Sequence, residues 1–407
     1  NPSGPEMDDD ALLGFYSALA RQCFINEYVC GQDEDETGLA HQLRNLLVEA
    51  LEKGGAVPPL WVAAVGAYFP LSNVPLADRL LDKSWPAAIG AVLTQQIREP
   101  KEESRLRAAI PRLTEIKDSV SCLVQAQYEE NPYPRWVAAG AAGPPEDLVT
   151  HLRQKFPFAA VEHSGVGERL EILVAGCGTG RNAIETTQRF KGAKTLAVDL
   201  SLNSLAHAAR KSRERPALAI EYAQADLLEL GSLERCFDLI EAVGVLHHLA
   251  DPLLGWDTLL SLLKPGGFMM AGFYSALARR NLPDVRARPA GAALTAQEVR
   301  QARQHLIGSR EAGDVTLRPD FFTTSTCRDL LFHVQERSLS LAEIGGFLHT
   351  RDLKFLGFSI EDAVLAAYRQ RFPGDPGATD LGHWQEFEAD NPDTFSGMYQ
   401  FWLQKAL

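Results

Sequence analysis

Apolar positions in the first third of the chain repeat with the spacing of an α-helix. They recur three and four residues apart, as in Leu43, Leu46 and Leu47, and clusters of β-branched residues are rare. Prolines interrupt the pattern often enough to divide it into several short helices. The pattern therefore predicts an all-helical N-terminal domain over residues 1–128.

From Leu170 onward the pattern changes to short apolar runs that alternate with helical stretches. This alternation is typical of a parallel sheet built from strand-helix-strand units. The predicted strands are residues 171–177, 195–201, 219–226, 237–245, 266–274, 353–360 and 398–406, with a helix over 339–351. The expected fold class is α/β, with a doubly wound, seven-stranded and mostly parallel sheet behind the helical domain.

The segment between these two regions is rich in proline. EENPYPRW, residues 129–136, holds two prolines that prevent a helix and favour an extended backbone. We therefore expect an extended segment and linker over 129–150 and a second domain over 151–407. A long polar stretch at about 276–337 reads as an insertion in that domain, partly helical because of its length.

Composition narrows the kinds of partner that the protein can have. The formal net charge of −13 over 407 residues argues against broad electrostatic capture of nucleic acid or anionic lipid. Six cysteines without CxxC pairs favour reduced thiols and a cytoplasmic location, and no zinc or other metal motif is visible. The sequence shows neither a signal peptide nor an apolar run of membrane-spanning length, so we expect no membrane association. It does not predict an oligomeric state.

The clearest chemical signal is the glycine-rich turn VAGCGTGRN at the end of the first predicted strand. Gly176, Gly178 and Gly180 would let the backbone approach a ligand closely, and the following helix would present its first NH groups. A nicotinamide-dinucleotide fold is an alternative, but its G-x-G-x-x-G pattern fails here because the last position is Arg181.

Acidic residues end the next two predicted strands. Asp199 could accept hydrogen bonds from both ribose hydroxyls of a nucleoside. Asp226 could accept from an adenine amino group, with Leu200 and Leu227 on either side of the ring. Each aspartate taken alone could instead cap a helix, but strand ends that all supply suitable groups at one sheet edge favour a nucleoside site.

These motifs, in this order, resemble class I S-adenosylmethionine-dependent methyltransferases over roughly residues 170–407. The matching segments are GCGTG, LAVDLS, AQADLLEL, VGVLHHLADP and LLKPGGFMM. EENPYPRW and RDLLFHVQE look like features of a bacterial subgroup in which this domain often follows tetratricopeptide repeats. No such repeat is legible in the N-terminal region.

The resemblance implies S-adenosylmethionine as the cofactor and S-adenosylhomocysteine as the product. The residues that it implies for cofactor binding are Gly176, Cys177, Gly178, Gly180, Asp199, Leu200, Asp226, Leu227 and Gly244. The acceptor would approach the segment after the fourth strand, where His247 and His248 could act as a base or could shape the pocket.

Several further residues have two open interpretations. Tyr133, Arg135 and Trp136 could close over the cofactor or the acceptor, with Arg135 paired to the cofactor carboxylate, or they could clamp the two domains together. Tyr274, Arg328 and His333 are expected to contact the acceptor, although a packing or solvated role is the alternative.

The expected activity is methyl transfer to a protein or peptide side chain, which the two large accessory regions favour. A small-molecule acceptor and a non-catalytic, cofactor-binding scaffold or sensor are the alternatives. The sequence argues against nucleic acid as the acceptor, because VLHHLADP stands where amino-directed adenine enzymes of this class have Asn/Asp-Pro-Pro-aromatic.

Overall fold

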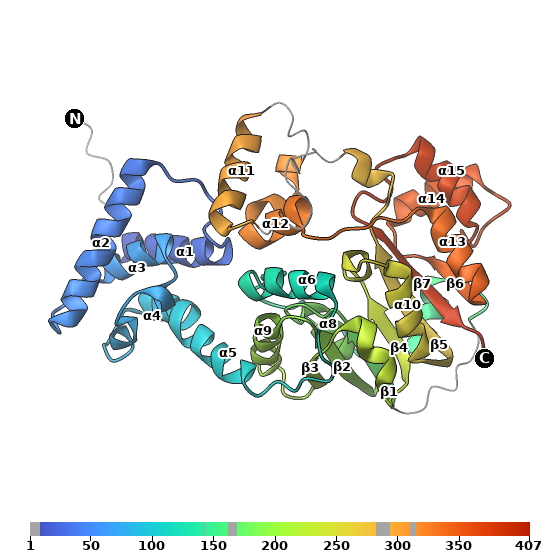
Figure 1. The fold of residues 1–407 in the computed structure, drawn as a ribbon, viewed down its shortest axis with the longest axis horizontal. Helices are drawn as coiled ribbons and strands as arrows, with labels where there is room; N and C mark the ends of the chain where they lie inside the picture. Colours follow the sequence, from blue (N-terminus) through green and yellow to red (C-terminus); the bar gives the residue numbers. More distant parts are fainter. Residues whose placement is uncertain (1–8, 142, 162–168, 282–293, 310–314) are drawn as a thin grey trace. The chain divides into compact units, whose positions relative to one another are not determined.

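The computed structural model describes residues 9–141, 143–161, 169–281, 294–309 and 315–407. The chain forms two compact units, each built from two stretches of sequence (Figure 1). The helical unit contains Asn1–Ala108 and Leu294–Phe332, and the sheet unit contains Ala109–Ala293 and His333–Leu407. This division differs from the predicted boundary at residue 128 and from the prediction that the insertion belongs to the sheet domain.

The described part of the helical unit has its own apolar core. Its longer helices are α1 (Asp9–Ile25), α2 (Glu34–Glu52), α3 (Pro59–Tyr68), α4 (Ala87–Leu93), α5 (Glu99–Arg107), α11 (Ala296–Gly308) and α12 (Thr324–Phe332). Apolar side chains spaced by three and four, such as Leu47 and Leu51, are buried in this core. The buried amide of Gln96 donates to the carbonyls of Ala20 and Gly66, both at 3.0 Å, and so satisfies backbone groups inside the core.

Helices α11 and α12 belong to the helical unit, and polar contacts tie both of them to Glu27, just after the end of α1. The Ser325 amide donates to Glu27 Oε2 at 2.6 Å, and the Thr324 hydroxyl donates to the Glu27 carbonyl at 2.9 Å. The periodicity of the insertion predicts helices but carries no information about these distant partners.

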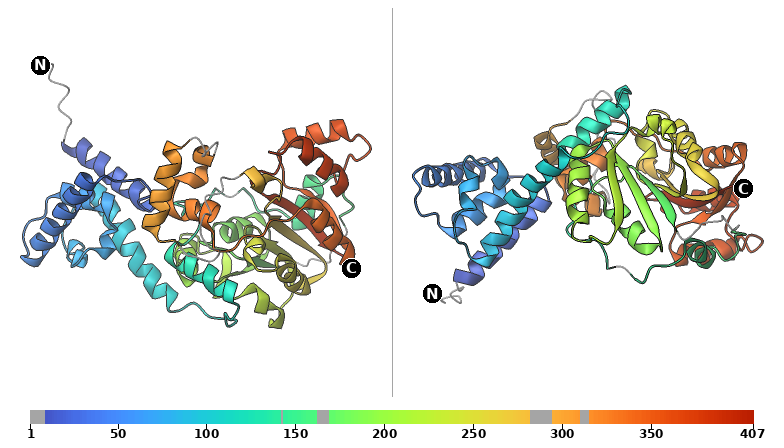
Figure 2. Two further views of the ribbon diagram at one scale, coloured as in Figure 1. Left: turned by 45° about the horizontal axis from the view of Figure 1, so that its top comes forward. Right: turned by 90° about the horizontal axis from the view of Figure 1, so that it is seen from below.

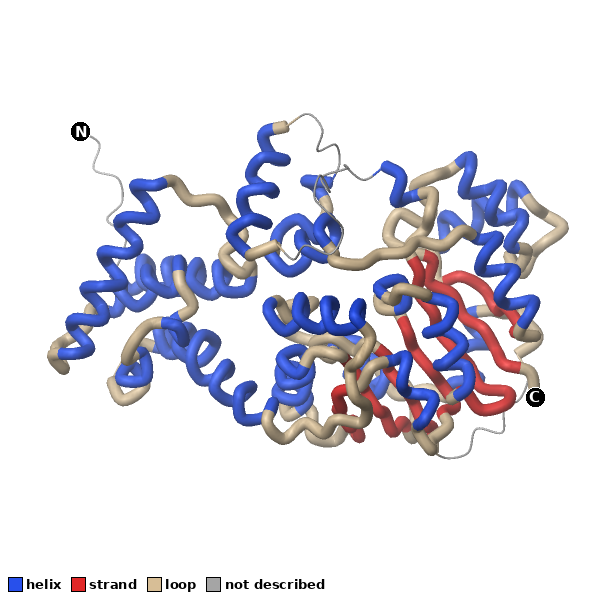
Figure 3. Tube along the Cα trace, in the orientation of Figure 1, coloured by secondary structure: helices blue, strands red, loops and turns tan. Residues whose placement is uncertain are grey.

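The sheet unit is built around a seven-stranded sheet, which confirms the predicted fold class. Its strands are β1 (Leu170–Ala175), β2 (Ala193–Asp199), β3 (Ala219–Gln224), β4 (Phe237–Ala242), β5 (Leu263–Phe273), β6 (Leu353–Phe358) and β7 (Tyr399–Lys405). The strand order is β3-β2-β1-β4-β5-β7-β6, and the strands are red in Figure 3. β7 runs antiparallel to both neighbours, β5 and β6, whereas the pairs among β1 to β5 are parallel.

Helices cover both faces of this sheet (Figure 2). One face packs against α7 (Leu148–Lys155), α8 (Arg181–Arg189) and α9 (Leu202–Ser212). The other packs against α10 (Pro252–Ser261), α13 (Leu341–Thr350), α14 (Asp362–Arg371) and α15 (Leu381–Asp390). Because both faces are covered, the central strands β1 and β4 are apolar along most of their length, which is why the sequence shows apolar runs there.

One further helix, α6 (Ser119–Glu130), belongs to the sheet unit. Its end is bonded to the start of α9: the Ser201 hydroxyl donates to the Tyr128 carbonyl at 3.0 Å, and the Asn203 side chain donates to the Glu129 carbonyl at 2.7 Å. Among the described helices, none combines the length and the apolar character that crossing a bilayer requires.

Candidate active site

The strand order places the predicted ligand-binding groups in a row along one edge of the sheet. Asp226 follows β3, Asp199 ends β2, the glycine turn follows β1, and Gly244 follows β4. Since these strands are adjacent and parallel, their carboxyl ends meet at the edge where doubly wound sheets bind ligands. The topology therefore brings together residues that lie as far as 68 positions apart in sequence, from 176 to 244.

A cavity of about 410 Å³ opens at this edge. Its volume lies within the usual range for small-molecule sites. Of the residues predicted for cofactor binding, its walls include Gly176, Cys177, Gly178, Asp199, Leu200, Asp226, Leu227, Gly244 and Tyr133. Gly180 and Arg135 are not part of the lining, and the same is true of Trp136, Tyr274 and His333 among the residues predicted to contact the acceptor.

The glycines of the turn are required by its geometry. Gly176, Gly178 and Gly180 all have positive φ angles, of 68°, 50° and 84°. A β-carbon on Gly178 would lie 2.4 Å from the Tyr133 carbonyl oxygen, and one on Gly180 would lie 2.5 Å from the Ala208 side chain. Gly180 thus permits close packing behind the turn, while Gly176 and Gly178 form the cavity wall.

The proline-rich segment is fastened to this turn. The Thr179 amide donates to the Tyr133 carbonyl at 3.2 Å, and the Thr179 hydroxyl donates to the Pro134 carbonyl. The Trp136 indole NH donates to the Thr179 hydroxyl at 3.1 Å. Trp136 therefore supports the turn from outside the cavity, whereas Tyr133 forms part of its wall.

Asp199 holds the turn through both of its carboxylate oxygens. Oδ2 accepts from the Gly178 amide at 2.8 Å, and Oδ1 accepts from the Ser201 amide at 2.9 Å. Burial raises the pKa of Asp199 to about 6 and outweighs these two hydrogen bonds, which lower it, while Glu129 adds a smaller increase. The carboxylate retains lone pairs that can accept from ligand hydroxyls.

Asp226 is 1% exposed and has one oxygen available to a ligand. Its Oδ1 caps the following helical turn by accepting from the Leu228 amide at 3.1 Å, as the helix-cap interpretation expected. The other oxygen, Asp226 Oδ2, is buried and accepts no hydrogen bond from any described residue. Burial raises the pKa of this carboxyl, and the Leu228 amide and the nearby Ser121 hydroxyl lower it. Both interpretations of Asp226 are thus compatible, because each uses a different oxygen.

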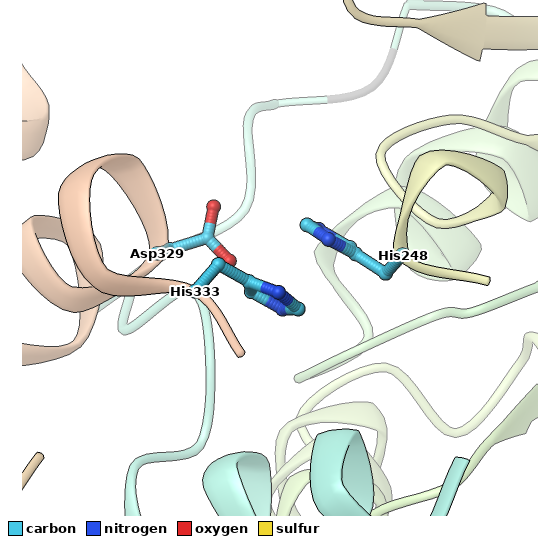
Figure 4. A group of neighbouring side chains, drawn as sticks. All are labelled: His248, Asp329 and His333. Atoms are coloured by element: carbon cyan, nitrogen blue, oxygen red, sulfur yellow. The ribbon is translucent and has the colours of Figure 1, made fainter. Parts of the chain in front are cut away.

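His248 is the histidine that reaches the cavity. Its Nδ1 must donate to the Gln335 carbonyl, 3.0 Å away, because a carbonyl can only accept; Nε2 is then the acceptor nitrogen. The His248 ring is stacked on His333 with 3.6 Å between ring centroids (Figure 4). Burial lowers the pKa of His248 to about 4, so the imidazole is neutral near pH 7.

His247 and Tyr274 lie behind this histidine rather than in the cavity wall. His247 is fully buried, its ring centroid is 3.9 Å from that of Tyr274, and burial lowers its pKa well below the ordinary value. His333 bonds to Tyr128 Oη through Nε2 at 3.1 Å and is 8% exposed. Arg328, on α12 of the helical unit, is 1% exposed. Asp329, which Figure 4 also labels, belongs to the same helix.

The cavity also contains residues that the sequence did not single out. They come from α6, α8, β5 and the β7 region: Ser121, Val124, Tyr128, Arg181, Asn182, Glu185, Met270, Met398 and Gln400. Arg181 could have been found because it directly follows the glycine turn. The α6 and β7 residues could not, because only the packing of α6 on α9 and the antiparallel placement of β7 bring them to this edge.

Comparison with known proteins agrees with this geometry. Residues 172–267 match the family described as "Methyltransferase domain". An uncharacterized protein of Synechococcus is 33% identical over 168 residues, covering 41% of this chain and 40% of that protein. A ubiquinone biosynthesis O-methyltransferase of Nitrobacter winogradskyi is 37% identical over 102 residues, covering 25% and 38%. The chain thus spans about two fifths of the length of these relatives.

Two solved structures illustrate the similarity found by structural comparison. PKMT2 of Rickettsia typhi has a TM-score of 0.45 at 16% sequence identity. The similar region covers 64% of this chain and 54% of the PKMT2 chain. Magnesium protoporphyrin IX methyltransferase of Synechocystis has a TM-score of 0.38 at 13% identity, covering 72% and 100%.

The sheet unit contains a class I S-adenosylmethionine-dependent methyltransferase domain, and residues 172–267 are the part that the methyltransferase family match covers. The predicted resemblance to this class is therefore confirmed. The resemblance to a subgroup fused to tetratricopeptide repeats remains a prediction, because the family match does not extend into the helical unit.

The cofactor of this class is S-adenosylmethionine, and the cavity has the groups that an adenosyl ligand requires. The buried Asp226 Oδ2 suits an amino donor, and the Asp199 carboxylate suits the ribose hydroxyls. Gly244 has a φ angle of 79°, and a β-carbon there would meet no atom within 4 Å, which leaves room for a ligand beside β4. The chain's residues therefore fit the cofactor, although the role of each one remains a prediction.

Proposed function

We propose that the sheet unit methylates an uncharged hydroxyl group of a small molecule that binds beside His248. The observation that carries the proposal is that His248, from the end of β4, lines the same cavity as the glycine turn and the two acidic strand ends. When bound, S-adenosylmethionine supplies an activated methyl group. The protein then has to align the acceptor with that group and exclude water, which accounts for much of the acceleration in such transfers.

His248 is suited to accept the proton of a hydroxyl acceptor. Donation from Nδ1 to the Gln335 carbonyl leaves Nε2 as the nitrogen with a lone pair, and burial keeps the ring neutral near pH 7. A histidine with a pKa of about 4 is a weak base toward a free hydroxyl. It is sufficient here because the hydroxyl becomes far more acidic as its oxygen bonds to the methyl group, so the proton can move late in the transfer.

The part of the cavity wall beyond the cofactor residues favours an uncharged acceptor. Around the ends of β4, β5 and β7 the lining is supplied by Leu249, Met270, Met398 and Gln400, none of which carries a charge. An ammonium acceptor would have to lose its hydration there without a carboxylate of its own. The match to ubiquinone biosynthesis O-methyltransferases, whose name states transfer to oxygen, supports the same choice.

A protein or peptide side chain is the second candidate acceptor. It is favoured by the helical unit, which has its own core and exposes large apolar side chains, including Phe15 at 60% and Leu39 at 66% exposure. Exposed apolar surface of this kind is common where proteins bind partners.

Transfer of a radiolabelled methyl group into a cell lysate tests the proposal and separates the candidates. We expect label in the small-molecule fraction with the full chain, and a large reduction with His248→Asn. His349→Asn, which changes an exposed histidine on α13, is the matched control and should retain activity. Label confined to protein would support the second candidate. Measurable binding of S-adenosylhomocysteine without label in either fraction would refute both and support a non-catalytic scaffold or sensor.

A further inference from the structure

His333 lies against the proposed base and outside the cavity. Its ring is stacked on the His248 ring, with 3.6 Å between the centroids and 18° between the ring planes (Figure 4). The His247 ring packs edge-on against the His248 ring, with 4.2 Å between the centroids. His333 is 8% exposed and is not part of the cavity lining. It thus contacts a residue of the cavity wall without being part of that wall.

The backbone of Gln335 is bonded to both stacked histidines. Its carbonyl accepts from His248 Nδ1 at 3.0 Å, and its amide donates to His333 Nδ1 at 3.1 Å. A ring nitrogen that accepts from an amide carries no hydrogen, so the His333 ring has its hydrogen on Nε2. His333 Nε2 therefore donates to Tyr128 Oη, 3.1 Å away. One backbone residue thus sets the tautomers of both rings, with Nδ1–H in His248 and Nε2–H in His333.

The segment 333–339 is held to the sheet unit by further backbone hydrogen bonds. The Val334 amide donates to Gln127 Oε1 on α6 at 3.2 Å. The Arg337 amide donates to the His247 carbonyl at 2.8 Å. Because one of these bonds leads to α6 and the other to the loop after β4, the segment cannot move freely relative to either element.

A buried ion pair supports the same segment. Arg279 donates to Glu336 Oε2 at 3.1 Å, and the two side chains are 11% and 5% exposed. The Arg279 guanidinium also lies over the Tyr274 ring, 3.5 Å from its centroid. Breaking a buried pair leaves one charge without its partner, which costs several kcal/mol. The backbone that carries His333 is therefore firmly placed before any ligand binds.

Resting on the proposed function, we propose that His333 is a positioning residue for His248. Its stacked ring limits rotation of the His248 ring, and the Gln335 carbonyl keeps the hydrogen on His248 Nδ1. Together they keep the lone pair on Nε2 and hold that nitrogen in one orientation, as proton acceptance from a bound hydroxyl requires. A misplacement of about 1 Å at a reacting group can lower a rate about 100-fold, so this support has a large effect on turnover.

Initial rates of methyl transfer test this proposal. The assay supplies radiolabelled S-adenosylmethionine to the full chain and measures label in the small-molecule fraction of a cell lysate. We expect His333→Ala to lower the rate about tenfold or more, and His333→Phe, which keeps a flat ring for stacking, to lose clearly less. S-adenosylhomocysteine affinity by calorimetry should stay nearly unchanged in both variants, which shows that the cofactor site is folded. His349→Ala, at an exposed position on α13, is the matched control and should retain the full rate.

A double variant separates a positioning role from a merely structural one. In a His248→Asn background, His333→Ala should cause little further loss, because the residue that it positions is already gone. Nitrogen NMR of the full chain with ¹⁵N-labelled histidine gives a measurement that does not depend on activity. At pH 7 His248 should show the Nδ1–H tautomer, and His333→Ala should shift it toward a mixture with the Nε2–H tautomer.

The possible failures of this inference and of the proposed function are distinguishable. An undiminished rate in His333→Ala, multiplied losses in the double variant, or an unchanged His248 tautomer in His333→Ala would overturn the positioning role and leave His248 as the base. A rate in His333→Phe as low as that in His333→Ala would overturn it too. A normal rate in His248→Asn alone, or no label in the small-molecule fraction with the unaltered protein, would refute the proposed function and this inference with it.

Discussion

Replacing Asp199 with asparagine should weaken cofactor binding by roughly 1 to 3 kcal/mol, or about five- to 150-fold. Both Asp199 oxygens accept from backbone amides, of Gly178 at 2.8 Å and of Ser201 at 2.9 Å. Asparagine has one oxygen, so one of these amides would face the side-chain NH₂ group. The variant therefore loses the charge that would accept from the ribose hydroxyls and also disturbs the glycine turn.

Isothermal calorimetry with S-adenosylhomocysteine measures this loss, and its pH dependence provides a second test. Because burial raises the pKa of Asp199 to about 6 and ribose hydroxyls bind the ionised form better, affinity should rise as pH increases to about 6 and level off above it. The part of this rise that comes from Asp199 should vanish in Asp199→Asn. An unchanged affinity in a folded Asp199→Asn variant, or an identical pH profile, would refute the assignment of Asp199 to the ribose.

Three further predictions follow from the same site. His248→Asn should lower turnover by at least tenfold with little effect on S-adenosylhomocysteine affinity, whereas His247→Asn should chiefly lower the free energy of unfolding. Steady-state kinetics and urea titration of both variants distinguish the two effects. Normal turnover in His248→Asn would mean that His248 only shapes the pocket. Because burial lowers the pKa of His248 from 6.5 to about 4, neutral His248 contributes stability that is fully present above about pH 6.5 and is lost as the pH falls toward 4. The free energy of unfolding should fall by up to about 3 kcal/mol over this range. Urea unfolding at pH 5 and 7.5 should therefore show a smaller pH dependence in His248→Gln, and an equal dependence would contradict the prediction. Gly178→Ala should reduce cofactor affinity by at least tenfold. The new β-carbon would lie 2.4 Å from the Tyr133 carbonyl oxygen, and residue 178 has a positive φ angle. Normal affinity by calorimetry would mean that the turn relaxes freely.

The sheet and the row of cofactor residues could be predicted because both depend on local pattern. Strands that are buried on both faces, such as β1 and β4, must be apolar almost throughout, and each of the seven predicted strands has a counterpart from β1 to β7. In a parallel sheet the group after each strand must lie at the same edge, which is why Gly176, Asp199, Asp226 and Gly244 share one cavity. The helical nature of the N-terminal region was equally predictable from its spacing.

The partner of each helix could not be predicted in this way. The apolar face of α6 resembles those of the helices before it, yet α6 bonds to α9 and supplies Tyr128 to the cavity. The helices of the insertion, α11 and α12, likewise bond to Glu27 of the helical unit. Periodicity shows that a face is buried, but it does not show what the face is buried against.

Adjacent residues with the same chemistry were separated only by tertiary structure. His247 and His248 are equivalent in the sequence, but His248 reaches the cavity while His247 packs under Tyr274. Tertiary structure also distinguishes two arginines that lie far apart in the sequence: Arg181 lines the cavity and Arg135 does not. The sequence alone determined the strands, the glycine turn and the acidic strand ends, because neighbouring residues set those features. Which side chains face the ligand was decided by contacts between elements distant in the chain, since the direction of a side chain in a loop depends on what packs around it.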